Sequence, residues 1–215
     1  MKLQQYSLVY KCVQIIFPWA ICRVKNSPNR IYLTFDDGPH PQQTPQILDI
    51  LRKYQIKASF FVLGFRSQEN PHLLKQIIAA GHALGNHAYT HRRLWKCPIK
   101  EIEKEILLTE KIIRQHTGVR TSHFRPPYGF FCPTIKPVLE KHRYKLVLWN
   151  VLTEDYQGNY STEKIVAQTL KATTPGSIVL LHDYNDKNNN TILVLPKLIQ
   201  NLKANGFQFG TIYEI

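Results

Sequence analysis

The sequence predicts an α/β fold, a single distorted (β/α) barrel with about seven parallel strands. The chain has 215 residues, a length that fits one compact domain. Apolar residues make up 43% of it and charged residues 20%, which is enough for a sizeable core. Short β-branched or aromatic runs alternate with helix-like segments, and this alternation requires crossover connections and mostly parallel strands. A closed or nearly closed barrel is favoured, although the residues alone also permit an open sheet.

Seven short runs are predicted as strands, and six segments between them as helices. The strands are expected at residues 31–35, 58–62, 83–86, 122–125, 145–149, 177–181 and 208–212. The helices are expected at 44–54, 71–80, 98–116, 134–142, 162–172 and 191–204. The clearest helix is 98–116, where a stripe of isoleucines opposes a polar face that includes Glu101 and Glu105. Gly118 supplies its C-terminal stop.

Residues 1–29 are expected to form an N-terminal structural element in front of a catalytic domain of residues 30–215. The uncharged stretch 12–22 is eleven residues long, against about 20 needed to span a bilayer, so no transmembrane segment is expected. Two lysines precede this stretch, as in a weak secretory signal, but no A-x-A cleavage pattern follows it. A structural element is therefore favoured over a discarded leader.

The chain is strongly basic, with 28 Lys and Arg against 15 Asp and Glu, a net charge of +13. This charge attracts polyanions, although a generally basic solvated surface explains it equally well. No helix-turn-helix, zinc-finger or RNA-binding signature accompanies it, so nucleic acid is not an expected partner. The four cysteines are widely spaced and suggest neither a zinc knuckle nor a redox motif. The polar segment 184–190 is interpreted as a surface loop.

Two carboxylates and two histidines directly follow predicted strands. Asp36 and Asp37 end the first strand in TFDDGP, where one side chain can face a metal and the other a proton. An ordinary Asp-Gly turn is the alternative. His87 and His91 follow the third strand at a spacing that lets both rings face one point in a helical turn. Together with Asp37 they form a candidate zinc set, although such a histidine pair alone more often fills surface or core.

Further polar residues follow the later strands. In FRPPYG, two prolines stiffen the segment and leave the Tyr128 amide available for a developing oxyanion, while Arg125 can keep a carboxylate charged. His182 follows a buried apolar run, where a neighbouring Asp can raise its pKa and make it a general acid. A rigid turn, a surface arginine and a core histidine are the respective alternatives. In parallel β/α folds the catalytic residues lie at the C-terminal ends of the strands. Each of these polar clusters follows a predicted strand, which favours a single site.

In order, TFDDGP, HAYTH, FRPPYG, the Asp155 segment and LLH resemble the five motifs of the polysaccharide deacetylases of carbohydrate esterase family 4, the NodB homology domain. The resemblance runs from about Ile31 to the C-terminus. It implies a metal-dependent hydrolase that removes N-acetyl groups from a polysaccharide or amino-sugar oligomer, such as chitin oligosaccharide or peptidoglycan. O-acetyl groups remain open as targets.

The resemblance also implies roles for individual residues. The implied metal ligands are Asp37, His87 and His91. The implied catalytic residues are Asp36 as base, Arg125 as its orienting partner, Tyr128 as oxyanion-hole amide, His182 as general acid and Asp155 as the residue that tunes His182. The implied substrate contacts are Tyr128 and Leu180, the latter as a wall against the acetyl methyl group.

The implied cofactor is a divalent metal ion, with Zn²⁺ as the default and Co²⁺, Ni²⁺, Mn²⁺ and Fe²⁺ left open by the ligand types. The resemblance implies an acetylated glycan as the partner, and the basic surface adds an anionic cell-wall polymer as a further candidate. This substrate class suggests the cell envelope or secretion, while the absence of a clear signal peptide leaves the cytoplasm open.

The chain departs from the family pattern at three positions. Ala88 stands where the family usually has Ser or Thr, and Leu152 and Tyr156 stand near Asp155 where an Asp and a Trp are usual. One alternative function is a catalytically silent glycan-binding module on the same fold. Another is a non-haem iron oxygenase, which would use the two histidines and one carboxylate but neither Asp36 nor His182.

Overall fold

The computed structural model describes residues 10, 12–157, 160–184 and 190–215. Its strands are β1 (Ala20–Ile21), β2 (Arg30–Asp36), β3 (Ser59–Val62), β4 (Ala83–Asn86), β5 (His123–Phe124), β6 (Lys145–Val147), β7 (Val151–Leu152), β8 (Ile178–His182) and β9 (Gln208–Gly210). Its helices are α2 (Gln43–Lys53), α3 (Gly64–Glu69), α4 (Pro71–Ala79), α5 (Ile99–Thr117), α6 (Lys136–Lys141), α7 (Thr162–Ala172) and α8 (Asn190–Ala204).

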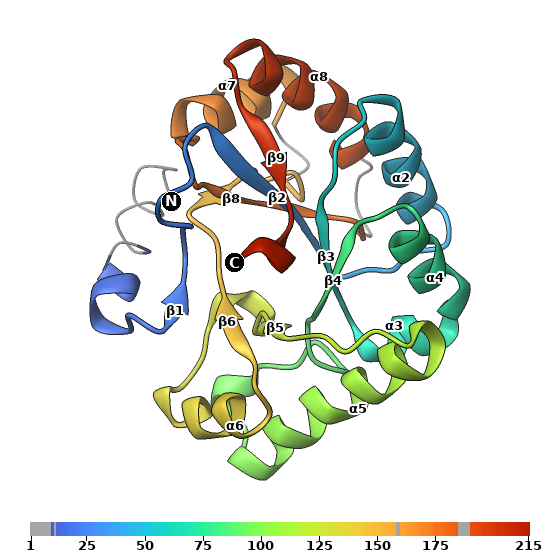
Figure 1. Cartoon of the computed structure of the whole chain (residues 1–215), viewed down its shortest axis with the longest axis vertical. Helices are drawn as coiled ribbons and strands as arrows, with labels where there is room; N and C mark the ends of the chain where they lie inside the picture. Colours follow the sequence, from blue (N-terminus) through green and yellow to red (C-terminus); the bar gives the residue numbers. More distant parts are fainter. Residues whose placement is uncertain (1–9, 11, 158–159, 185–189) are drawn as a thin grey trace.

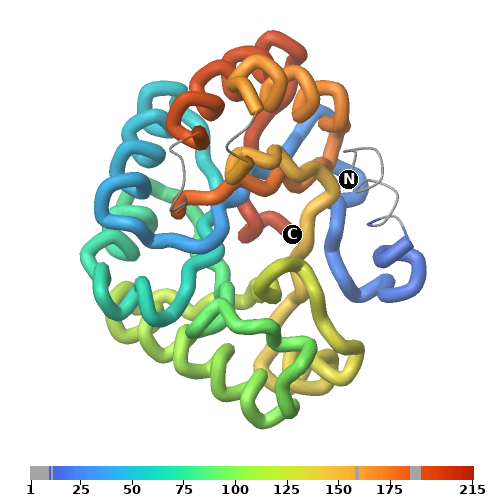
Figure 2. Tube along the Cα trace, turned by 180° about the vertical axis from the view of Figure 1, so that it is seen from behind, coloured from blue at the N-terminus to red at the C-terminus, as the bar shows by residue number. Residues whose placement is uncertain are grey.

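The strands form one curled parallel sheet in the order β1-β6-β5-β4-β3-β2-β8-β7, with β9 paired to β2. The long helices surround this sheet on the outside, and the C-terminal turn lies in the middle of the ring (Figure 1). The same ring is visible from behind (Figure 2). The predicted distorted (β/α) barrel is therefore confirmed. The seven predicted strands correspond to β2, β3, β4, β5, β6, β8 and β9.

The described part of the N-terminal segment packs into the barrel. β1 pairs in parallel with β6, and the N–H of Val24 donates to the carbonyl of Gly176 at 2.9 Å. This segment therefore lies on the side of the ring between α6 and α7 (Figure 1). None of the helices in the described part of the chain is long and apolar enough to cross a membrane. The domain boundary at residue 29 stays a prediction.

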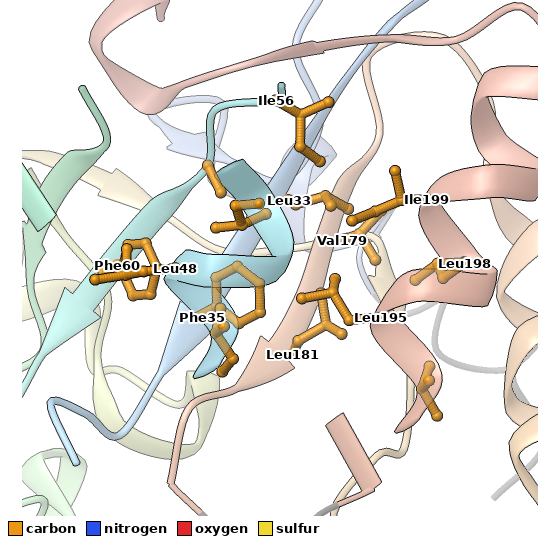
Figure 3. Close-up of a cluster of buried hydrophobic side chains, with 14 of the residues drawn as sticks. Leu33, Phe35, Leu48, Ile56, Phe60, Val179, Leu181, Leu195, Leu198 and Ile199 are labelled. Carbon is orange, nitrogen blue, oxygen red and sulfur yellow. The ribbon is translucent and has the colours of Figure 1, made fainter. Parts of the chain in front are cut away.

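The main core lies between the sheet and the outer helices. Leu33 and Phe35 of β2 and Val179 and Leu181 of β8 point toward α8, where Leu195 and its neighbours cover them (Figure 3). Side chains alternate between the two faces of a strand. The residues between these, and the strand ends that follow them, therefore face the interior of the barrel. This alternation places Asp36 and His182 on the interior face.

The polar face of α5 differs from the prediction. The helix ends at Gly118 in the left-handed conformation (φ 73°), as predicted. However, Glu105 is 7% exposed, whereas Ile99 of the predicted apolar stripe is 39% exposed. The assignment of Glu105 to the solvent-facing side was wrong because its carboxylate bonds to the loop that follows β4.

Two smaller predictions concern the cysteines and the loop at 184–190. Cys12, Cys22, Cys97 and Cys132 are free thiols. The predicted surface loop includes residues 185–189, which lie outside the described residues.

Candidate active site

The candidate site forms where neighbouring parallel strands end. Asp36, the last residue of β2, lies opposite His182, the last residue of β8. His87 directly follows β4, and Arg125 directly follows the neighbouring β5. Parallel strands end at one edge of the sheet, so residues separated by more than a hundred positions meet there.

Asp37, His87 and His91 converge on one point. Asp37 Oδ1 lies 3.4 Å from His87 Nε2 and 3.0 Å from His91 Nε2. Within the described part of the chain this oxygen is buried and has no hydrogen-bond donor of good geometry. His87 Nδ1 lies 2.8 Å from the carbonyl of Arg125, so Nε2 is the ring atom turned toward Asp37. One oxygen and two imidazole nitrogens fit a divalent metal, and a hydrogen bond on the far ring nitrogen is usual for a histidine ligand.

The electrostatics of this group favour added positive charge. Burial acts to raise the pKa of Asp37, but the imidazoles of His87 and His91 outweigh it and hold the pKa well below its usual value. Burial acts to lower the pKa of His87, but the carboxylates of Asp36 and Asp37 outweigh it and raise the pKa. A proton on an imidazole and a bound metal ion would each supply the positive charge that these carboxylates favour.

The two histidines lie in a loop, so the predicted helical turn was wrong. Ala88 (φ 68°) and His91 (φ 58°) have left-handed backbones, which a helix does not contain. The two ring centroids nevertheless lie 5.3 Å apart. The convergence of the rings results from left-handed turns and not from helical spacing.

Arg125 is fully buried and bound to Asp36. Its Nη1 lies 2.6 Å from Asp36 Oδ1 and donates to Thr34 Oγ1 at 2.9 Å. Its Nη2 and Nε donate to the carbonyls of Leu148 and Val147. Burial lowers the pKa of Arg125, and the charge of Asp36 opposes this shift. Because four acceptors hold the guanidinium, its orientation toward Asp36 is fixed.

His182 and Asp155 form a second buried pair. Nδ1 of His182 lies 2.9 Å from Asp155 Oδ1, and the hydroxyl of Thr191 donates to Oδ2 at 2.6 Å. Burial acts to lower the pKa of His182, but the Asp155 carboxylate outweighs it and raises the pKa to about 9. Tyr156, one of the family departures, places its ring edge-on to His182 at 5.3 Å between centroids. The imidazole is therefore a cation at neutral pH, held by its carboxylate.

Tyr128 and Leu180 lie near these pairs. Tyr128 has a left-handed backbone (φ 63°) in a tight turn, and its half-exposed ring lies 4.6 Å from that of His91. Leu180 is buried in β8 opposite Thr34 of β2 and two residues before His182, so it shares the interior face with them.

Several contacts of the site were not predicted from the sequence. Trp95 lies 5.7 Å from the ring of Tyr128 and 5.2 Å from that of Phe130, which is 62% exposed. Tyr128 and Phe130 are exposed and Trp95 is partly buried, and together these rings form an aromatic surface beside His91. Asp183 is buried, accepts the hydroxyl of Thr44 at 2.7 Å, and has its pKa raised to about 7, mainly by burial. The LLHD sequence signalled Asp183, but Asp155 is the carboxylate that pairs with His182.

Carboxylates, imidazoles and an arginine gather at the C-terminal ends of the strands of this parallel barrel, which is where enzymes of this fold class carry their acid and base groups. Residues 23–147 match the sequence profile of the polysaccharide deacetylases, and this chain belongs to that family. The family predicted from the five motifs is therefore confirmed.

Named relatives act on acetylated amino sugars. A peptidoglycan-N-acetylglucosamine deacetylase of Bacillus cereus is 36% identical over 89% of this chain and 90% of its own length. A chitooligosaccharide deacetylase of Bradyrhizobium is 34% identical over 86% of this chain and 90% of its own length.

Solved structures share the fold across nearly the whole chain. A peptidoglycan N-acetylglucosamine deacetylase, crystallised with 4-naphthalen-1-yl-N-oxidanyl-benzamide, superposes with a TM-score of 0.86 at 34% identity and covers 91% of both chains. A pseudoenzyme of carbohydrate esterase family 4 from Bacillus anthracis has a TM-score of 0.84 at 28% identity, with coverage of 91% and 68%. The family therefore contains both enzymes and proteins that have lost activity.

Proposed function

We propose that this chain is a metal-dependent N-deacetylase of an amino-sugar polymer, with peptidoglycan or chitin oligosaccharide as the substrate class and Zn²⁺ as the metal. The observation that carries the proposal is the buried Asp37 oxygen, which lies 3.4 and 3.0 Å from two imidazole nitrogens. The names of the relatives support the substrate class.

The ligands in this proposal are Asp37, His87 and His91. The bound ion supplies Lewis-acid chemistry, polarising the acetyl carbonyl and making water easier to deprotonate. Asp36 is the base that takes the proton of the attacking water. Arg125 Nη1, 2.6 Å from Asp36 Oδ1, orients this carboxylate and leaves Oδ2 on the side of His87, 3.7 Å from its Nε2.

His182 is the acid in this proposal. With its pKa raised to about 9 by Asp155, it carries a proton at neutral pH and gives it to the departing sugar amine. The Tyr128 amide faces the developing oxyanion, and Leu180 contacts the acetyl methyl group. The products are acetate and an amino sugar. The exposed ring of Phe130, packed against the partly buried Trp95, offers an apolar face to the neighbouring sugars of the polymer.

A catalytically silent glycan-binding module is the competing function, because the family includes a pseudoenzyme. Against it, the proposed base, acid and metal ligands are all present and lie within contact distance of their partners. We also propose an anionic cell-wall polymer as a binding partner of the enzyme, because the net charge of +13 attracts such polymers. An iron oxygenase would leave the buried Asp36–Arg125 and Asp155–His182 pairs without a role.

The experiment is an acetate-release assay with four substrates: chitin oligomers, peptidoglycan fragments, poly-N-acetylglucosamine and acetylated xylan. The protein is stripped of metal and then reloaded with Zn²⁺ or another divalent ion. We expect release from an N-acetylated substrate that disappears on stripping and returns on reloading. Release from xylan alone would indicate O-deacetylation. Glycan binding without acetate release under any metal would establish the silent module instead.

A further inference from the structure

The loop that carries the two histidines is held differently at its two ends. At the beginning of the loop, the N–H of His87 donates to the Val62 carbonyl at 3.0 Å, and its Nδ1 contacts the carbonyl of Arg125. His87 is therefore fixed by the sheet. His91 follows four residues later, at a left-handed φ, and its side chain is one quarter exposed. Its position depends on how residues 88–90 are held.

Helix α3 holds the carbonyl groups of this loop. The N–H of Gly64 donates to the carbonyl of Ala88 at 2.9 Å, and the N–H of Phe65 donates to that of Tyr89 at 3.2 Å. These are the first amides of α3, which have no acceptor inside their own helix. The contact gives the first amides of α3 their acceptors and gives the carbonyls of Ala88 and Tyr89 their donors.

Glu105 of α5 holds the amides on the other side of the loop. Its Oε2 accepts the N–H of Tyr89 at 2.9 Å and that of Thr90 at 2.8 Å, and its Oε1 accepts the Thr90 hydroxyl at 2.9 Å. Arg92 Nε lies 3.7 Å from Oε1. A buried carboxylate with three donors directs the loop strongly, because hydrogen bonds to a charged acceptor are short and strong.

We propose that Glu105 is a positioning residue for the candidate metal site: by binding the amides of Tyr89 and Thr90, it sets where the His91 imidazole lies against Asp37 and His87. This inference rests on the proposed function, because the metal belongs to that proposal. Glu105 is none of the proposed ligands or catalytic residues, and it acts through the backbone of the loop.

Glu101 provides a matched control. It lies one turn earlier on α5 and also pairs with Arg92, but its side chain is half exposed. Glu101→Ala removes the same charge from the same helix and leaves the loop amides bound to Glu105. A general effect of charge or helix stability would appear in both variants, whereas an effect on the position of His91 appears only in Glu105→Ala.

The test measures Zn²⁺ affinity by competition with a chromophoric chelator, together with the visible absorption spectrum of the Co²⁺-loaded protein. We expect Glu105→Ala to bind Zn²⁺ about 10- to 100-fold more weakly, as is usual when a group that orients a ligand is lost. We expect its Co²⁺ spectrum to change as well. Glu101→Ala keeps the wild-type affinity and spectrum. Glu105→Gln restores most of the affinity, because its amide oxygen can accept both N–H groups.

If Glu105→Ala does not fold, Thr90→Val removes one of the three bonds and keeps the side-chain shape. It should weaken Zn²⁺ binding about fivefold, the effect of one hydrogen bond. The inference is overturned if Glu105→Ala keeps the wild-type Zn²⁺ affinity and Co²⁺ spectrum. The same holds for Thr90→Val if that variant replaces Glu105→Ala. An equal loss of Zn²⁺ affinity in Glu101→Ala would also overturn it. If the wild-type chain binds metal but releases no acetate, the proposed activity is wrong and the inference about Glu105 stands. A wild-type chain that binds no metal overturns both proposals.

Discussion

Asp155 contacts His182 with both carboxylate oxygens: Oδ1 lies 2.9 Å from the ring Nδ1, and Oδ2 accepts the backbone N–H at 2.8 Å. The two residues are 27 positions apart, and Asp155 lies in the motif that departs most from the family pattern. The hydroxyl of Thr191 donates to the same Oδ2. Asp155 is thereby fixed, and it raises the pKa of His182 to about 9.

The first prediction concerns the alkaline limb of the pH–rate profile. A general acid must be protonated, so the rate falls as pH rises through its pKa. We expect Asp155→Asn to move the alkaline limb of kcat/KM to lower pH, because the charge that holds the proton on His182 is lost. Metal affinity should not change, since neither residue is a proposed ligand. His182→Ala should reduce turnover at every pH.

Glu154→Gln is the control for this pH prediction, because Glu154 is a buried neighbouring acid. It should leave the alkaline limb in place. An unshifted limb in Asp155→Asn, together with a severe defect in His182→Ala, would show that the acid works without Asp155. A shifted limb in Glu154→Gln alone would make Glu154 the partner.

The second prediction concerns the metal ligands. Three ligand atoms converge, so the purified chain should bind about one divalent ion, the stoichiometry of a mononuclear site. His87→Ala or His91→Ala should abolish binding and turnover, whereas His72→Ala, an exposed histidine of α4, should alter neither. Metal content by elemental analysis and acetate release are the measurements. Full occupancy and activity in His87→Ala would remove this site from the mechanism.

The third prediction concerns Asp36. Asp36→Asn keeps the size of the side chain but cannot take a proton from water, so the rate should fall by about 10² to 10⁴ while metal still binds. The variant should also unfold at lower temperature, because the buried guanidinium of Arg125 loses its charged partner. Kinetics are therefore compared at a temperature where both proteins are folded.

Asp49→Asn is the control for this substitution, since Asp49 forms an exposed ion pair with Arg52. It should change neither rate nor stability measurably, because exposed pairs contribute little. Near-normal deacetylation by Asp36→Asn would mean that the proposed mechanism needs another base.

The strands and most helices could be predicted because their apolar runs are long enough to show a period. β1 and β7 were not predicted: they have two residues each, and they form because neighbouring strands offer them partners. β5 is equally short, but it lies in the predicted run 122–125. The six-residue α3 likewise shows no apolar stripe. The left-handed backbone of Ala88 could not be read from the sequence, since alanine rarely adopts it. Histidine adopts it more often than most residues, but no local pattern marks His91 for it.

The proposed catalytic and metal-binding residues could be located because they lie at or just after strand ends, and the parallel sheet brings those ends together. Residues that act from elsewhere could not be located in this way. Glu105 reaches the loop from a helix face, and Trp95 meets Phe130 from a separate turn. Their contacts depend on packing between segments that are distant in the sequence, for which no local pattern exists.

The last prediction concerns Gly38, which follows the two aspartates. A Cβ atom there would lie 2.0 Å from Asp183 Oδ2 and 2.2 Å from Oδ1, inside contact distance of a buried carboxylate. Asp183 is held by the hydroxyl of Thr44 and cannot withdraw without losing that bond. Gly38→Ala should therefore lower the free energy of unfolding by about 1–3 kcal/mol, the usual cost of overpacking.

The turn at Gly38 also sets the positions of Asp36 and Asp37, so Gly38→Ala should weaken metal binding together with stability. In an Asp183→Ala background the obstructing carboxylate is gone, and the added methyl group should cost less. Urea denaturation of the two single variants and the double variant measures this coupling, which should be at least about 0.5 kcal/mol for groups in direct contact. Strictly additive losses would show that Gly38 is required for its backbone alone and that Asp183 does not support the turn.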